Sequence, residues 1–403
     1  MNVIYLDHNA TAPLWPEVAD ALDEATRAGY ANPASQHAPG RRARQALEDA
    51  REEIGARFGA ETQTARRDQV ILTSGGTEAN NLALFGLTGH GPRRAILSAI
   101  EHPSVSETAD ALAQDGWQVD RIRVSPDGIV DVEHLRELLA EPVAVVSVMA
   151  ANNETGVLQP LAEIAAACAS AGVPLHADAV QAGGKVPLDF RQLGLAAMTV
   201  SAHKMHGPRG IGALIARHGI QLRPRLHGGF QQGGLRPGTE AVAPAVGMLA
   251  ALRLWDARRE TIVPRMTQLR DRFEDGLRSA LVRLDGLPAG NQPNQQGGEV
   301  VINGAGAPRL PHATNAAFPG LDRQALMMAL DFAGIACSTG SACASGSSEP
   351  SPTLIAMGCP PDIVKSSLRF SLGAGTTAEE IDEALRRIQA VVSQLRGQAD
   401  QRS

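Results

Sequence analysis

Short apolar runs separated by helical patterns constrain the fold of this chain more than any other feature of its 403 residues. Each run has the length and the Val, Ile, Leu and Ala content of a buried β-strand. Between two such runs, residues 161–171 show apolar faces at helical spacing, and Gly172 follows, a residue favoured just after a helix. This alternation predicts an α/β fold with a largely parallel sheet. The predicted strands are 70–73, 95–98, 143–148, 173–176, 198–200 and 211–215.

The length of the chain predicts more than one core, because single hydrophobic cores stop growing at about 250–300 residues. A helical stretch from about 241 to 284 is followed by a polar segment rich in Gly, Gln and Asn at 290–298. We therefore expect a second domain to begin in this part of the chain. The predicted large domain spans residues 15–260, and a smaller α+β domain comprises residues 1–14 and 261–403.

Composition narrows the class of protein. Apolar residues make up 43% and charged residues 20%, with a net charge of −6, which favours a soluble globular enzyme over a disordered, membrane-spanning or nucleic-acid-binding chain. The N-terminus lacks the basic start and apolar run of a signal peptide, so we expect a cytoplasmic protein. The four cysteines form no Cys-x-x-Cys pair. We also expect no metal, because His203 and His206 have no carboxylate or thiol at ligand spacing.

One lysine stands in a distinctive stretch, Ser-Ala-His-Lys-Met-His-Gly-Pro over residues 201–208. Lys204 follows an apolar run, and loss of water around its amine would lower the pKa and make the amine nucleophilic. Asp178 ends another apolar run, where a carboxylate needs a cationic partner. Pyridoxal phosphate needs both groups, an amine for its aldehyde and a carboxylate for its protonated ring nitrogen. A solvated loop lysine and a helix-capping aspartate stay open as alternatives on these residues alone.

Other polar clusters follow predicted strands, and ligands of open α/β sheets bind at the carboxyl ends of the strands. Residues 74–81 read Ser-Gly-Gly-Thr-Glu-Ala-Asn-Asn, a glycine turn whose free N–H groups and helix dipole suit a phosphate. This turn matches neither the P-loop nor the dinucleotide fingerprint, and an ordinary strand-to-helix turn is its alternative. His102 could stack on a planar cofactor, while Asn153 and Gln181 could hydrogen-bond to a ring oxygen. None of these clusters decides the cofactor alone.

A reactive sulfur and an anion-binding guanidinium are predicted near the C-terminus. Residues 337–351 are nearly all small or polar and cannot build a core, so Cys343 should be an exposed, reactive thiol on a loop of about 333–352. Cys337 directly follows an apolar run and is expected to pack. Arg369 lies in an apolar, strand-like setting, where a guanidinium needs an anion such as a substrate carboxylate. A structural Arg–Asp pair is the alternative for Arg369.

Taken together, these motifs resemble the pyridoxal-phosphate cysteine desulfurases that supply sulfur for iron–sulfur cluster assembly, within the class V aminotransferases. The resemblance covers nearly the whole chain, and the small residues around Cys343 are similar to the long-loop branch. It implies fold type I of the pyridoxal-phosphate enzymes. The motifs that carry it are Tyr-Leu-Asp-His-Asn-Ala-Thr at 5–11, Asn-Pro-Ala-Ser-Gln-His at 32–37, the turn at 74–81, Ser-Ala-His-Lys at 201–204, Ser-Ala-Cys-Ala-Ser at 341–345 and Arg-Phe-Ser at 369–371.

The resemblance implies a role for each residue of the site. Lys204 would form a Schiff base with the cofactor and move the α-proton of L-cysteine, while Cys343 would attack the substrate sulfur, leaving a persulfide and alanine. His102 would stack on the ring and act with these two in catalysis, and Arg369 and Asn153 would bind the substrate. The cofactor-binding residues implied are Gly76, Thr77, His102, Asn153, Asp178, Gln181, Ser201, His203, Lys204 and Thr239.

The same resemblance implies partners. Thr239 would reach the phosphate of a second subunit, so a homodimer is expected. Sulfur-acceptor proteins, such as an iron–sulfur scaffold, would receive the persulfide, with transient iron–sulfur cluster ligation at Cys343 during transfer. A tRNA-thiolation enzyme is another acceptor of this kind.

One segment departs from the family pattern. Residues 227–235 read His-Gly-Gly-Phe-Gln-Gln-Gly-Gly-Leu, with Gln232 and Gly233 where an acidic and a basic residue are expected, and Ala374 stands where some members carry arginine. These changes spare the predicted chemical groups but alter the edge of the pocket on the dimer side. A selenocysteine lyase-like enzyme of the same fold, or a weakly active sulfur-transfer scaffold, is the alternative function.

Overall fold

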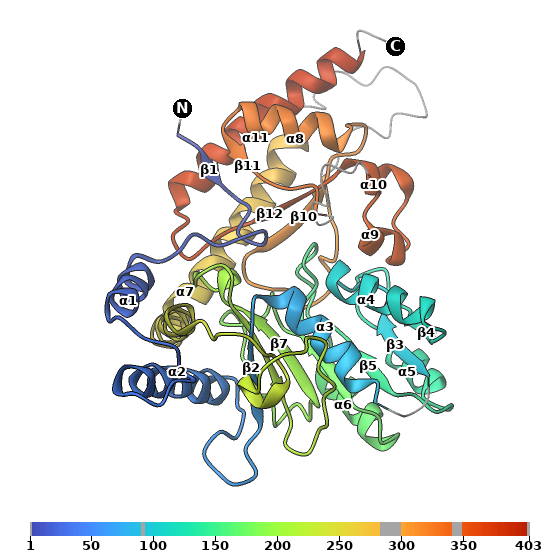
Figure 1. Ribbon diagram of the computed structural model, residues 1–403. Coiled ribbons are helices and arrows are strands. Elements are labelled where there is room, and N and C mark those ends of the chain that lie inside the picture. Colours follow the sequence, from blue (N-terminus) through green and yellow to red (C-terminus); the bar gives the residue numbers. More distant parts are fainter. Residues whose placement is uncertain (1, 90–92, 283–299, 341–348, 401–403) are drawn as a thin grey trace.

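A seven-stranded sheet forms the centre of the larger domain (Figure 1). The computed structural model describes residues 2–89, 93–282, 300–340 and 349–400. Strand β8 is antiparallel to both its neighbours, and the remaining pairings in this sheet are parallel. The predicted α/β fold with a mostly parallel sheet is therefore confirmed. In spatial order the strands are β2 (Gln69–Thr73), β8 (Gly212–Ala216), β7 (Ala197–Ser201), β6 (Leu175–Asp178), β5 (Val145–Ser147), β3 (Arg94–Ser98) and β4 (Gln118–Ile122).

Both faces of this sheet are buried, which explains why its inner strands are continuous apolar runs rather than alternating ones. In β2, Val70 and Leu72 belong to the main core on one face, while Ile71 belongs to the core on the other face. Helices α2 (Ala38–Arg57), α5 (Val132–Leu138) and α6 (Leu161–Ser170) contribute to the main core, and α3 (Gly76–Leu87) to the opposite one. Helix α4 (Pro103–Gln114) packs against α3.

Strand β4 was not predicted from the sequence. It lies at the edge of the sheet, and its residues Val119, Asp120 and Arg121 are half-buried or exposed. An edge strand with little apolar surface lacks the buried run by which the other strands are recognised. The remaining strands of this sheet fall within two residues of their predicted positions.

The smaller domain combines helices with two small sheets, which fits the α+β class expected for it. A three-stranded antiparallel sheet has the order β12, β10, β9, and β1 pairs with β11 in parallel. The expected loop of about 333–352 therefore begins later, because two of its residues form β11. The elements of this domain are β1 (Ile4–Tyr5), β9 (Val301–Ile302), β10 (Ala313–Ala317), α8 (Arg323–Phe332), β11 (Ile335–Ala336), α9 (Pro352–Ala356), α10 (Pro361–Ser366), β12 (Ser367–Ser371) and α11 (Ala378–Asp400).

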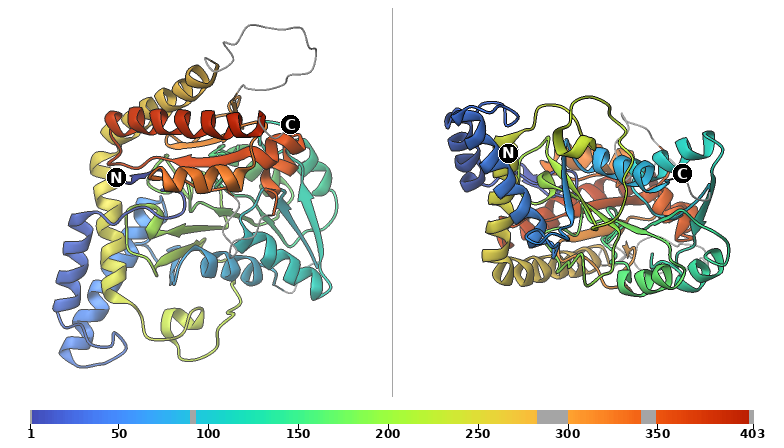
Figure 2. Two further views of the ribbon diagram at one scale, coloured as in Figure 1. Left: turned by 90° about the horizontal axis from the view of Figure 1, so that it is seen from above. Right: turned by 60° about the horizontal axis from the view of Figure 1, so that its bottom comes forward.

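Helix α7 (Val242–Val282) joins the two cores (Figure 2). Its first part packs with the large core up to Met266 and contacts α1 (Pro16–Arg27) and α2, while Leu269 and Phe273 belong to the small core. The predicted domain boundary at 260/261 lies on this same helix and stays a prediction. Within the described ranges, no helix is long and apolar enough to cross a membrane.

The small core gives a test of its contribution to stability. Leu330 on α8 is fully buried in this core, so Leu330→Ala should lower the free energy of unfolding by about 2–5 kcal/mol, through lost burial and the cavity left behind. Met328 on the same helix is 56% exposed, and Met328→Ala should change stability by less than about 0.5 kcal/mol. Urea unfolding followed by circular dichroism measures both. Equal losses from the two variants would contradict this assignment of the buried face.

Candidate active site

A cavity of about 300 Å³ opens where the large sheet meets the small domain. The carboxyl ends of the strands converge there, as they do at ligand sites of open α/β sheets. All predicted site residues line it except Thr239, which is exposed elsewhere, and Cys343, which lies outside the described residues. The lining residues are Asn9, Ala10, Gly76, Thr77, Asn80, His102, Ser104, Met149, Ala151, Asn153, Asp178, Val180, Gln181, Ser201, His203, Lys204, Ser338 and Arg369.

One end of the cavity is formed by the first turn of α3. The backbone N–H groups of Gly76 and Thr77 have no acceptor inside the helix, and the helix dipole places partial positive charge at this end. A Cβ at position 76 would come within 2.8 Å of the Val180 side chain, so only glycine fits this close approach. Ser201 lies beside this turn, and its buried Oγ has no hydrogen-bond partner among the described residues. This end can bind an anion such as a phosphate.

Asp178 lies at the end of β6 with its carboxylate buried in the cavity wall. Its Oδ2 accepts a hydrogen bond of 2.7 Å from Asn80 Nδ2, and its Oδ1 accepts one of 2.9 Å from the Val180 N–H. These neutral donors fix the orientation of the carboxylate but leave its charge without a salt bridge among the described residues. A cationic ligand group in the cavity would supply the missing charge partner.

His102 caps the N-terminus of α4, and this role fixes which of its ring nitrogens accepts a hydrogen bond. Its Nδ1 accepts a hydrogen bond of 3.1 Å from the Ser104 N–H and lies 2.8 Å from Ser104 Oγ. Burial lowers the pKa of His102, which favours the neutral ring. A neutral imidazole held at its Nδ1 edge can present its face to a planar ligand.

Lys204 extends into the cavity from a short 3₁₀ turn, η1 (Ala202–Lys204), directly after β7. Its Nζ donates to the backbone carbonyls of Asn9 and Ala10, the latter at 2.7 Å. Burial, followed by the Arg369 charge, lowers the pKa of Lys204 to about 8, although Asp7 and Asp178 oppose this shift. The amine is thus much closer to its nucleophilic, neutral form at neutral pH than an ordinary lysine is.

The chain contains three lysines in all, at 185, 204 and 365. Lys204 lines the cavity, whereas Lys365 is exposed on α10. Lys185 is 5% exposed, and its Nζ donates to the Gln181 carbonyl at 3.1 Å outside the cavity lining. No other lysine can therefore take the place of Lys204 in this site.

Asn9 connects the parts of the site, and sequence reasoning gave it no role. Its carbonyl accepts hydrogen bonds from both Lys204 Nζ and Gln181 Nε2, the latter at 3.1 Å. Its own side chain is held by His312 at 2.7 Å and donates to the Asn153 carbonyl at 3.2 Å. The signal that could have found Asn9 is its place in the motif at 5–11 rather than any spacing rule.

Arg369 lies on β12 and points toward the same cavity. One nitrogen, Nη2, pairs with Asp7 Oδ1 at 2.8 Å, and Nη1 donates to the Asn153 carbonyl at 3.1 Å. Its buried Nε has no partner among the described residues. The ion pair that was an alternative explanation for Arg369 is present. The Nε–H of the guanidinium is nevertheless left to donate to a further anion.

Glu154 hydrogen-bonds to one flank of the segment that carries Cys343 and lies close to the other, a role that sequence reasoning also missed. Ser351 Oγ donates to Glu154 Oε2 at 2.7 Å, and a Cβ at Gly340 would lie 2.9 Å from the same oxygen. Burial raises the pKa of Glu154. On the near side of this segment, Ser338 exchanges two backbone hydrogen bonds with Arg369, of 3.1 and 2.7 Å. Residues 341–348 themselves lie outside the described part of the chain.

The histidines beside Lys204 show no metal-binding arrangement. His203 Nδ1 lies 3.3 Å from Thr11 Oγ1, and His206 Nδ1 bonds to the Pro13 carbonyl at 2.7 Å while its ring stacks on Trp15. Across the described ranges, no three His, Cys, Asp or Glu side chains are grouped as metal ligands. Burial lowers the pKa of His203 to about 4, so its ring is neutral and can donate one hydrogen bond.

Comparison with known proteins places this fold and site in a class. The profile of the family described as aminotransferase class-V matches residues 4–384, so the chain belongs to that family. Within it, the chain is similar to curated cysteine desulfurases. A cysteine desulfurase of Enterobacter agglomerans is 39% identical over 98% of this chain and 94% of its own, and an IscS-like cysteine desulfurase of Mycobacterium tuberculosis is 39% identical over 97% of each.

Solved structures agree with this placement. A NifS-like protein from Rickettsia africae superimposes with a TM-score of 0.83 and 32% identity, covering 97% of this chain and 99% of its own. The fold is thus that of the pyridoxal-phosphate enzymes of fold type I, and the family uses pyridoxal phosphate as its cofactor. The predicted family, fold and cofactor are confirmed by these findings.

The residues present fit pyridoxal phosphate. The phosphate suits the first turn of α3 and the unsatisfied hydroxyl of Ser201, and the protonated ring nitrogen suits the unpaired charge of Asp178. The buried Gln181 Oε1, which has no partner among the described residues, adds a polar atom beside these groups.

The lowered pKa of Lys204 predicts how cofactor capture depends on pH. Only the neutral amine attacks an aldehyde, and with a pKa of about 8 its fraction rises from about one tenth at pH 7 to about nine tenths at pH 9. The rate of covalent linkage between cofactor-free protein and pyridoxal phosphate should follow this rise. Borohydride trapping and peptide mapping at each pH would measure it at Lys204. A rise centred above pH 10, as for free lysine, would contradict the burial argument.

Proposed function

We propose that this chain is a pyridoxal-phosphate-dependent cysteine desulfurase that converts L-cysteine to L-alanine and carries the sulfur as a persulfide of Cys343. The proposal rests chiefly on one observation, the common cavity of Lys204 and Asp178, with a low-pKa amine and a buried carboxylate that lacks a charge partner. Membership of the family and similarity to curated cysteine desulfurases support it.

The residues around the cavity would each hold one part of the cofactor. Gly76, Thr77, Ser201 and His203 would bind the phosphate, and His102 would stack on the ring. Asp178 would keep a proton on the ring nitrogen, and Gln181 and Asn153 would contact the ring oxygen. When bound, the cofactor supplies an aldehyde that captures amines and a ring that withdraws electrons from the substrate α-carbon.

The substrate would be handled by three further groups. Arg369 would bind the carboxylate of L-cysteine, and the unpartnered Nε supports this role. Lys204 would take the α-proton and return it, since its pKa of about 8 lies near neutral pH. The Cys343 thiolate would form a bond to the substrate sulfur as the carbon–sulfur bond breaks. The electron pair stays with the carbon skeleton, which takes up protons and leaves as alanine.

The partners are proposals of the same kind. The names of the relatives support sulfur transfer, and an iron–sulfur scaffold protein is the acceptor we propose, with transient cluster ligation at Cys343. We propose a homodimer in which the exposed Thr239 reaches the cofactor phosphate of the second subunit. A cytoplasmic location is likewise proposed.

The role of Cys343 gives the decisive test. Cys343→Ala should keep the absorbance of bound cofactor but lower sulfide release from L-cysteine in the presence of a reductant by about 100-fold or more, because the nucleophile is gone. Mass spectrometry of the peptide containing Cys343 after incubation with L-cysteine should show an added sulfur in the wild-type protein.

Cys337 provides a matched control. Burial raises the pKa of its thiol to about 12, so it stays protonated and unreactive, and Cys337→Ala should keep most of the activity. Sulfide release by Cys343→Ala at the wild-type rate would contradict the proposal. Release of selenide from selenocysteine without sulfide from cysteine would favour the selenocysteine lyase alternative instead.

A further inference from the structure

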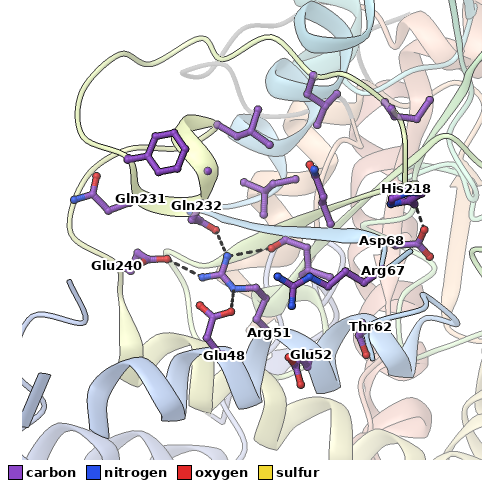
Figure 3. Close-up of a pocket in the computed structure, with 18 of the residues that line it drawn as sticks. Glu48, Arg51, Glu52, Thr62, Arg67, Asp68, His218, Gln231, Gln232 and Glu240 are labelled. Atoms are coloured by element: carbon purple, nitrogen blue, oxygen red, sulfur yellow. Dashed lines mark hydrogen bonds and ion pairs between the residues drawn. The ribbon is translucent and has the colours of Figure 1, made fainter. Parts of the chain in front are cut away.

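Two of the three positions at which this chain departs from the family pattern, Gln232 and Gly233, lie in a segment that packs against the edge of the large sheet. We call residues 230–240 the edge segment; it contains the turn η2 (Gln231–Gly234) and ends just before α7. Figure 3 shows it beside β2 and α2. Its residues help to line an open hollow of about 1080 Å³. Thr239 belongs to this segment, and in the proposed homodimer it would reach the cofactor phosphate of the second subunit.

The side chain of Gln232 hydrogen-bonds to the backbone of β2, one of the two edge strands of the large sheet. Its Nε2 donates to the Leu72 carbonyl at 2.8 Å, and its Oε1 accepts from the Leu72 N–H at 2.7 Å. Because β2 is an edge strand, these two groups face away from β8 and would otherwise be open to solvent or to another strand. An acidic side chain, expected at this position from the family pattern, could accept but not donate. The amide therefore satisfies both groups of Leu72 at once.

A charged network reinforces this contact. Arg51 on α2 donates to Gln232 Oε1 at 2.9 Å and to Glu240 Oε1 at 2.7 Å, so both ends of the edge segment are tied to the same guanidinium (Figure 3). The backbone at Gln232 is left-handed, with φ of 50°, a conformation that residues other than glycine rarely adopt. The contacts of its amide offset that strain.

A second connection reaches the predicted phosphate turn. Arg236 binds Glu78 through two nitrogens, at 2.8 and 3.3 Å, and Glu78 Oε2 accepts from the Ser74 N–H at 2.6 Å. Leu72 lies near the end of β2 and Ser74 directly after it, shortly before Gly76 and Thr77. The edge segment thus holds both the strand that leads into the turn and the helix that follows it.

We infer that Gln232 is a positioning residue for the phosphate end of the active site. Its amide fixes the edge segment on Leu72, and through Leu72 and the Arg236–Glu78 pair it holds the turn at 74–77 in the geometry that binds phosphate. This inference rests on the proposed function, because it assumes that the turn binds the cofactor phosphate. The glutamine that stands at position 232 in place of an acidic residue thus has a structural role.

The test compares a phosphorylated and an unphosphorylated ligand. The full chain is stripped of cofactor and titrated with pyridoxal 5′-phosphate and, separately, with pyridoxal, for the wild type and for Gln232→Leu. We expect Gln232→Leu to raise the dissociation constant of pyridoxal 5′-phosphate about tenfold and to leave that of pyridoxal unchanged, because only the phosphate contacts are disturbed. Hydrogen exchange of the β2 peptide in the holoenzyme should become faster, since the Leu72 N–H loses its acceptor.

Two further variants make the outcome unambiguous. Gln221 also lines the hollow but makes no side-chain hydrogen bond to any described residue, so Gln221→Leu should behave as the wild type. Gln232→Glu keeps the acceptor for the Leu72 N–H and Arg51 and should give an intermediate loss, which preserves the test if the leucine variant does not fold. Equal weakening of both ligands, or no weakening, would overturn the inference.

These measurements do not depend on turnover. A wild-type protein that binds pyridoxal 5′-phosphate but releases no sulfide from L-cysteine would refute the proposed function. The comparison of the two ligands would still decide the role of Gln232.

Discussion

The active site depends on Asn9, which lies on the N-terminal segment and touches both domains. Its carbonyl accepts hydrogen bonds from Lys204 and Gln181, and its side chain is fixed by His312 and by the Asn153 carbonyl. Asn9 is 1% exposed, and its own N–H bonds to Ser371 Oγ at 2.8 Å, at the end of the strand that carries Arg369. One asparagine therefore sets the spacing between the lysine of the large domain and the arginine of the small one.

Burial determines the chemistry of the groups that Asn9 assembles. The same loss of water that lowers the pKa of Lys204 keeps His102 and His203 neutral, and it raises the pKa of Glu154 at the base of the cysteine-bearing segment. Neutral rings can stack and donate without adding positive charge beside the lysine. The cavity thus places one reactive amine beside two neutral imidazoles, and the loss of water around that amine lets it act as a nucleophile and a base.

Sequence patterns predicted the scaffold well, because buried parallel strands are continuous apolar runs and their ends attract ligands. Lys204 and Asp178 were found in this way, and the family resemblance placed ten predicted residues that the structure brings into one cavity. Other features carry no such signal. The half-exposed strand β4 has no apolar run, the antiparallel direction of β8 leaves no trace in its composition, and Asn9, Asn80 and Glu154 work through contacts with residues far away in the chain.

The scarcity of lysine has a consequence for a protein that handles an aldehyde. Pyridoxal phosphate condenses with neutral amines but not with guanidinium groups, and only three of the 37 basic residues of this chain are lysines. Lys185 is shielded in the interior, which leaves Lys365 as the lysine on the described surface. Few lysines outside the cavity can therefore form an unproductive Schiff base with the cofactor. An amine-directed label would therefore have few sites to be told apart by peptide mapping, because most basic residues of this chain are arginines.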